Sequence, residues 1–143
     1  MRLALAILAL ATFAGPVLAG DDIEVSGAWA RPSLGQTGAS ALYFTLTNGA
    51  AADVLTSVDV PDVERAEVHE TTNTDGVMAM RPVAELPLAP GVTVSFAPGG
   101  KHVMLMGLKK PLKVGDHIAA TLRFKAHAPL AVDAVISMTA PVK

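Results

Sequence analysis

The 143-residue chain contains no cysteine. This absence excludes disulfide bonds, thiolate catalysis, zinc–thiolate sites and iron–sulfur clusters. Aromatic residues make up only 4% of the chain, and positive charge is sparse. The densest basic cluster, Lys109, Lys110 and Lys113, is too small to follow a phosphate backbone. Nucleic acid is therefore not an expected partner.

Long apolar stretches are also lacking, except at the N-terminus. Residues 3–19 are almost entirely apolar after a single Arg2, but Gly15 and Pro16 interrupt the stretch before the roughly 20 residues that a spanning helix needs. Small residues around Ala19 fit a signal-peptidase site. We therefore predict a signal peptide over residues 1–19, and an exported, periplasmic protein without a stable membrane anchor after cleavage. No cysteine follows the cleavage point, so lipid attachment there is not expected.

The remaining residues, 20–143, suffice for a single domain with one hydrophobic core. Turn signals such as Asn48-Gly49, Asn73–Gly76 and Pro98–Gly100 recur every 8 to 12 residues or so, which is typical of a sandwich or barrel. Residues 82–98 are rich in Pro and Val and show no helical period. The sequence predicts an all-β domain, with strands over 23–31, 41–47, 54–60, 65–69, 77–80, 101–108, 117–125 and 130–139.

The stretch Lys101–Met106 has an unusual pattern for a strand. Because side chains alternate between faces, Val103 and Leu105 point to the core, and His102, Met104 and Met106 share the other face. That second face would ordinarily be polar. Met78 and Met80 form a similar pair one predicted hairpin after His69.

Thioether and imidazole together are a neutral, soft ligand set, which favours Cu(I) among the common metals. A blue-copper electron-transfer centre is excluded because it needs a thiolate. Met is also a common filler of cores, and a lone His is usually structural. The residues alone leave open whether Met78 or Met80, and Met104 or Met106, would serve as ligands. His117 and His127 lie outside the pattern, and Trp29 is expected in the core.

The spacing of these residues resembles a known family. His69 is followed after ten residues by Met80, and after a further twenty-one residues by His102-Val103-Met104. This arrangement resembles the signature of the periplasmic copper chaperones called PCu(A)C. The similarity extends to the stretches Trp29–Arg31 and Tyr43–Asn48, and covers nearly all of residues 20–143.

The resemblance implies a cupredoxin-like, Greek-key β-barrel or sandwich that binds one Cu(I). The implied ligands are His69, Met80, His102 and Met104, with Met78 and Met106 as neighbours. Family members deliver copper to the binuclear copper site of cytochrome c oxidase, either directly to its copper-bearing subunit or through a thiol-bearing copper chaperone. For such a transfer we expect the ligands near the surface, on two hairpins at one end of the barrel.

Three other interpretations compete with this one. The first is periplasmic copper storage or resistance, with the same site but no delivery. The second is a structural sandwich whose Met residues bind no metal. The third is an enzyme, which we do not expect because the sequence offers no paired carboxylates, nucleophile elbow or phosphate-binding loop.

Overall fold

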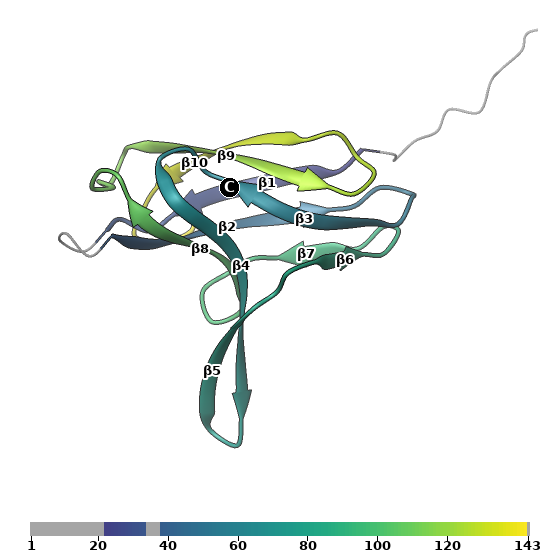
Figure 1. The fold of residues 1–143 in the computed structure, drawn as a ribbon, viewed down its shortest axis with the longest axis horizontal. Helices are drawn as coiled ribbons and strands as arrows, with labels where there is room; N and C mark the ends of the chain where they lie inside the picture. The colour runs from purple at the N-terminus through teal and green to yellow at the C-terminus, as the bar shows by residue number, and fades with distance from the viewer. Residues whose placement is uncertain (1–21, 34–37, 143) are drawn as a thin grey trace, which may run out of the picture.

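The computed structural model describes residues 22–33 and 38–142, so the predicted signal peptide lies outside the described residues. Those two ranges contain strands and no helix, and therefore no helix there that could cross a membrane. The strands, coloured along the chain in Figure 1, are β1 Glu24–Ala30, β2 Ala39–Thr47, β3 Asp53–Asp59, β4 Val63–Thr74, β5 Val77–Pro82, β6 Leu86–Leu88, β7 Thr93–Ser95, β8 Lys101–Leu108, β9 His117–Phe124 and β10 Leu130–Ile136.

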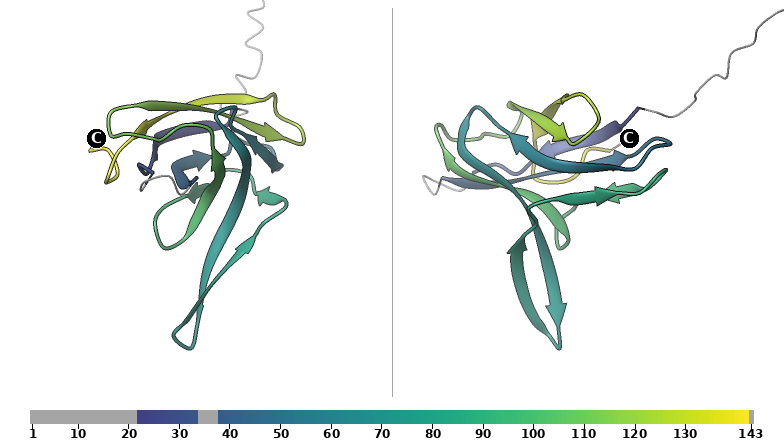
Figure 2. Two further views of the ribbon diagram at one scale, coloured as in Figure 1. Left: turned by 60° about the vertical axis from the view of Figure 1, so that its left-hand side comes forward. Right: turned by 45° about the vertical axis from the view of Figure 1, so that its right-hand side comes forward.

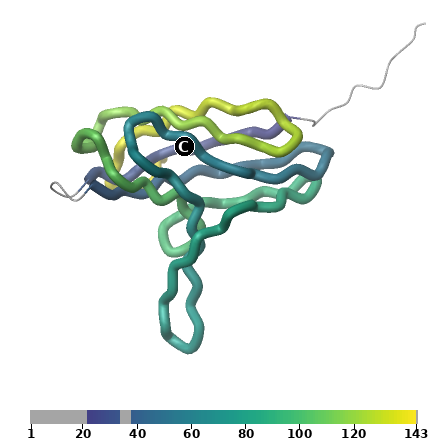
Figure 3. Tube along the Cα trace, viewed as in Figure 1, coloured from purple at the N-terminus to yellow at the C-terminus, as the bar shows by residue number. Residues whose placement is uncertain are grey.

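All ten strands belong to one mixed sheet, in the order β5-β4-β8-β2-β1-β10-β9-β3-β6, with β7 added beside β2. Only β1 and β10 pair in parallel; every other described pair is antiparallel. The sheet curls on itself, so that the main body has two layers with the core between them (Figures 1 and 3). The all-β, cupredoxin-like prediction is confirmed.

The core forms because the strands alternate between apolar and other residues, with period two. On β2, Leu42, Phe44 and Leu46 are fully buried, and on β8 Val103 and Leu105 are fully buried. Phe44 stacks on Phe96 with ring centroids 4.4 Å apart. Each such side chain contributes about 1.5–3 kcal/mol through removal from water. The predicted inward face of residues 101–106 is therefore confirmed.

One hairpin leaves this body. The first part of β4 pairs with β8, from Val63 to Glu70, and its last part pairs with β5, from His69 to Thr74. Beyond Glu70 the hairpin consists of two strands only, and it projects away from the body (Figures 1 and 2). We call residues 71–82 the arm. Every residue of β5 is exposed.

The arm closes through a two-residue turn. Asp75 and Gly76 both have positive φ, of 53° and 82°, which is the geometry of a type I′ turn. Its right-handed twist matches that of the strands, and Asp-Gly is among the preferred pairs. The side-chain oxygen of Asn73 accepts a hydrogen bond from the Gly76 amide at 3.1 Å. The hairpin predicted from Asn73–Gly76 is therefore present.

The structure differs from the sequence predictions mainly at strand ends and in short strands; β10, for example, ends at Ile136 and not at residue 139. The short strands β6 and β7 lie in residues 82–98, where three-residue strands leave no readable period. β4 continues to Thr74 rather than ending at His69. Trp29 is buried as expected, but it lies outside the main core cluster, where its ring packs on Tyr43 with centroids 4.7 Å apart.

Candidate metal centre

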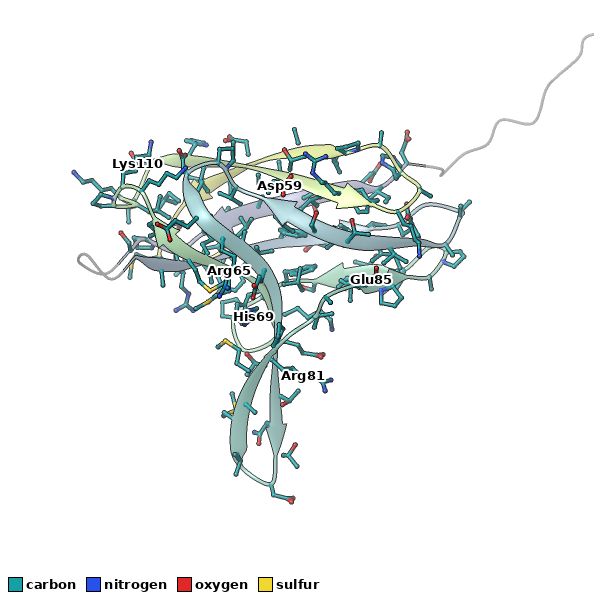
Figure 4. All side chains as sticks on the ribbon, in the orientation of Figure 1. Asp59, Arg65, His69, Arg81, Glu85 and Lys110 are labelled. Atoms are coloured by element: carbon teal, nitrogen blue, oxygen red, sulfur yellow. The ribbon has the colours of Figure 1, made fainter. Side chains whose placement is uncertain are left out.

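His69 and His102 are directly paired across β4 and β8. Residues paired across an antiparallel ladder project to the same side of the sheet. Their ring centroids lie 5.9 Å apart, with an interplanar angle of 46°. His69 occupies the row at which β5 also joins β4, so the histidine pair marks the root of the arm. Figure 4 labels His69 there, between the body and the arm.

The methionines flank this pair in successive rows along β4. On the body side, Met104 pairs with Glu67. On the arm side, Met80 pairs with Thr71. Because residues two apart on a strand share a face, both thioethers project to the same side as the two imidazoles. We call the side of the sheet that is opposite to the core the outer face. All four predicted ligands lie on this outer face.

Met106 and Met78 occupy the next rows outward. Met106 pairs with Arg65, whose guanidinium nitrogen Nη2 lies 3.3 Å from its sulfur. Met78 pairs with Asn73, near the tip of the arm, and is 61% exposed. Each row adds two residues, or about 6.6 Å of strand. The rows nearest the histidines therefore hold Met80 and Met104, which the resemblance also implied as ligands.

His102 is 6% exposed although it lies on the outer face. The chain between β7 and β8 loops over it, and the Gly100 carbonyl accepts hydrogen bonds from its Nδ1 at 3.3 Å and from the Thr71 amide at 3.2 Å. Because a carbonyl only accepts, Nδ1 carries the proton and Nε2 keeps a free lone pair. Burial lowers the pKa of His102; the Gly100 bond opposes this, and the nearby His69 ring adds to it. The neutral form, which a metal requires, is favoured.

His69 is oriented by a carboxylate. Its Nε2 lies 3.0 Å from Glu67 Oε2, and the other Glu67 oxygen accepts from Arg65 Nε at 3.2 Å. An ionised carboxylate only accepts, so Nε2 donates and Nδ1 is left with its lone pair. Metal-binding histidines commonly donate their other ring N–H to a carboxylate in this way. Figure 4 labels Arg65 and His69 along β4.

A surface hollow of about 430 Å³ opens beside the site. Its walls include Met80, His102 and Met104, but not His69. The rest of the wall comes from the two residues after β1, from β2, the arm and the loop before β8: Arg31, Pro32, Ala39, Ser40, Ala41, Tyr43, Thr71, Pro98 and Gly99. Three of the four predicted ligands therefore face one solvent-accessible space, and the fourth, the imidazole of His69, lies next to His102.

The position of the site differs from the sequence prediction in one respect. The four side chains lie on the outer face of the sheet, at the root of the arm, and not at one end of the barrel. The sequence could not show this, because it depends on the registers of β4 with β8 and β5. Among the described residues, no three His, Asp or Glu side chains are grouped to hold a metal.

The sequence analysis did not single out Glu67, the carboxylate that contacts His69. Glu67 could have been found from the two-residue period before His69 on the same strand. Glu70 and Arg81, which adjoin predicted ligands in sequence, lie on the opposite face, where Glu70 contacts Arg81 and Lys101 at 3.4 Å each. These contacts lower the pKa of the partly exposed Glu70 carboxyl, with Lys101 as the larger cause.

The chain has relatives that are recognisable by sequence. Residues 23–136 match the family described as "Putative lipoprotein LpqE-like". The chain belongs to the LpqE-like family. A relative from Leifsonia xyli subsp. xyli, "Putative lipoprotein Lxx21020", is 33% identical over 116 residues, which span 78% of this chain and 69% of the relative. The uncharacterized protein RP573 of Rickettsia prowazekii is 36% identical over 101 residues, 67% of this chain and 56% of its own length.

Solved structures resembling this LpqE-like chain include copper-binding domains. The copper-bound PCuAC domain from PmoF2 superposes with a TM-score of 0.70 at 27% identity, covering 86% of this chain and 97% of that domain. The Cu(I) form of DR1885 from Deinococcus radiodurans gives 0.56 at 30% identity, with 78% and 77% covered. Its apo form gives 0.63 at 28% identity, with 97% and 92% covered. The LpqE-like domain is thus PCuAC-like, which confirms the resemblance.

Proposed function

We propose that this protein is a periplasmic Cu(I) metallochaperone that binds one copper ion through His69, Met80, His102 and Met104. The observation that carries the proposal is the cross-strand pairing of His69 with His102, with Met80 and Met104 in the adjacent rows of the same face. The copper-bound PCuAC domain and the Cu(I) form of DR1885 support it, because both share this fold.

The donor set suits holding and releasing a cargo ion. Four neutral donors stabilise Cu(I) over Cu(II), and soft thioethers select it over harder metals. None of the four is bound as an anion, so an incoming thiolate competes well for the metal. Three of the four line the surface hollow, which leaves the site open to such a partner. This chemistry needs no bond-breaking in a substrate, and we propose binding and transfer rather than catalysis.

The acceptor we propose is the binuclear copper site of cytochrome c oxidase, reached directly at its copper-bearing subunit or through a thiol-bearing copper chaperone. The predicted signal peptide over residues 1–19 and the lipoprotein names of the family and of its Leifsonia relative support a location outside the cytosol. In that compartment free thiolates oxidise readily, which favours a thioether-based site.

A competition titration tests the binding site. The protein and a His102→Ala, Met104→Ala double variant are titrated with Cu(I) against a coloured chelator. We expect one Cu(I) bound by the protein and at least a hundredfold weaker binding, about 2.7 kcal/mol, by the double variant. A matched control is His117→Ala, Met138→Ala, which changes the same residue types at exposed positions away from the site. Equal binding by all three proteins would end the ligand assignment.

A transfer experiment tests delivery. Two equivalents of the Cu(I)-loaded protein are mixed with the purified, copper-free copper domain of the oxidase, with and without a thiol-bearing chaperone, and the proteins are separated so that the copper bound to each can be measured. We expect both equivalents of copper on the oxidase domain. Copper that stays on the protein in both mixtures would favour storage or resistance instead.

A further inference from the structure

The hollow beside the proposed site extends well beyond the ligands. It reaches across β2 to the end of β1, where Arg31 forms part of the wall. Arg31 follows Trp29 by two positions, and its backbone amide donates to the Ala41 carbonyl at 3.1 Å, so its side chain lies on the outer face with Tyr43 and Met104. One face therefore presents a guanidinium and the proposed copper ligands to the same space.

The Arg31 head group is held in place by stacking. Its Cζ lies 5.8 Å from the Tyr43 ring centroid, and Tyr43 in turn packs against Trp29. Cation–π stacking of this kind fixes the planar guanidinium over the ring. Within residues 22–33 and 38–142, no carboxylate forms an ion pair with Arg31. It is also the only formally charged side chain among the described residues that line the hollow.

A cation at this position does nothing to retain copper. Cu(I) held by two imidazoles and two thioethers is a complex of charge +1, and Arg31 repels it. The guanidinium instead attracts an anion that enters the hollow. We propose that Arg31 and the hollow form the docking point for the thiolate-bearing segment of the acceptor, guiding its sulfur to the copper. This inference rests on the proposed function and names the acceptor chemistry at that same site.

The transfer step keeps copper as Cu(I) throughout. A cysteine thiol of the acceptor loses its proton to solvent, and a lone pair on the thiolate sulfur forms a copper–sulfur bond. One neutral donor of this protein leaves with its own lone pair, and the complex goes from charge +1 to 0. A second thiolate repeats the exchange and brings the charge to −1. Each exchange adds negative charge, and an adjacent guanidinium favours both the thiolate and the mixed complex.

The test compares two acceptors of different charge. Cu(I)-loaded protein is mixed in stopped flow with a Cys-x-x-Cys peptide or with neocuproine, a neutral phenanthroline chelator, and the rate of copper withdrawal is measured. For Arg31→Gln we expect withdrawal by the dithiol peptide to slow about tenfold, while withdrawal by neocuproine changes by less than about twofold. Arg31→Lys should recover part of the rate, since lysine keeps the positive charge but lacks the planar guanidinium that lies over the Tyr43 ring.

Two controls separate this role from others. Arg81→Gln removes a cation from the opposite face beside Met80, and should leave both rates unchanged. At 1 M salt, where the screening length is about 3 Å, the difference between Arg31→Gln and the unaltered protein should shrink. Rates that fall equally for both acceptors, or for neither, would overturn the inference. If the unaltered protein holds no Cu(I) in the chelator titration, the proposed function fails as well.

Discussion

His69 on β4 faces His102 on β8 in direct cross-strand register, with 5.9 Å between the ring centroids. The four neighbouring methionines are arranged in rows on either side of this histidine pair. Met80 and Met104 occupy the rows on either side, and Met78 and Met106 the rows beyond. A strand can alternate between core residues and the proposed copper ligands because its two faces are independent.

The row order predicts unequal roles for the methionines. Met80→Ala or Met104→Ala should weaken Cu(I) binding at least about tenfold, which corresponds to about 1.4 kcal/mol, because each removes a donor. Met78→Ala should change the affinity by less than about threefold, since Met78 is one row further from the histidines. Chelator competition measures all three. A larger loss from Met78→Ala than from Met80→Ala would shift the site toward the tip of the arm.

Glu67 is predicted to position His69. In Glu67→Gln the amide no longer supplies a charged acceptor for the His69 ring N–H, and the Cu(I) affinity should fall about tenfold, in the range found for such outer partners. The melting temperature of the copper-free protein should barely change, because the Glu67 side chain is 37% exposed and its ion pairs are worth little there.

A matched control for Glu67 is Glu64→Gln, which removes an exposed carboxylate three residues earlier on β4. It should leave the copper affinity unaltered. If Glu67→Gln and Glu64→Gln behaved alike, the 3.0 Å contact between Glu67 and His69 would have no part in metal binding.

The lowered pKa of His102 has a defined sign for stability. The unfolded chain takes up a proton at His102 near pH 6.5, whereas the folded protein does so only at lower pH, mainly because of burial. Protons therefore favour the unfolded state, and the free energy of unfolding of the copper-free protein should fall as the pH drops from 6.5 to the folded pKa. Denaturation with urea between pH 7 and pH 5 measures this.

His102→Gln is the comparison for that titration, because glutamine keeps a polar side chain without a titrating group. Its stability should vary less with pH over the same interval. Protons should also compete with copper for His102. This competition should begin only below the pH range in which a free imidazole titrates. A stability difference between the two proteins that stays constant from pH 7 to pH 5 would contradict the prediction.

We predict that the arm contributes to copper binding but not to the stability of the fold. Gly76→Val forces a branched residue into φ +82°, which costs about 1–2 kcal/mol, although nothing lies within 4 Å of the added carbon. A two-stranded hairpin is marginal by itself, so the arm should fray and displace Met80. We expect weaker Cu(I) binding with a nearly unchanged melting temperature.

Gly115→Val provides the converse case, since Gly115 has φ +94°, equally open surroundings and a place in the turn before β9. It should lower the melting temperature, because the Gly115 amide donates to Ile136 of the body, and leave copper affinity intact. Loss of copper binding in Gly115→Val but not in Gly76→Val would reverse the assignment of the two regions.

The sequence predicted the fold class, and placed His102, Met104 and Met106 on one face of a strand, because both predictions depend on local patterns. The alternation from Lys101 to Met106 assigns faces without reference to any other strand, and Asp75-Gly76 specifies its own turn. The ligand choice between Met78 and Met80 came from the resemblance, and the row order now gives it a structural reason.

What the sequence could not give depends on contacts between distant residues. The outward projection of the arm follows from β4 pairing with β8 over one half and with β5 over the other. The burial of His102 depends on the loop that ends at Gly100, and the Arg31–Tyr43–Trp29 stack depends on the register of β1 with β2. Strands of three residues, such as β6 and β7, are formed by their neighbours and carry no period of their own.

The coordination sphere itself provides the most direct test of the central claim. Copper K-edge X-ray absorption on the Cu(I)-loaded protein should show two nitrogen and two sulfur neighbours, and one sulfur fewer in Met80→Ala and in Met104→Ala. A spectrum with nitrogen and oxygen neighbours only, or a sulfur contribution unchanged in both variants, would contradict the account.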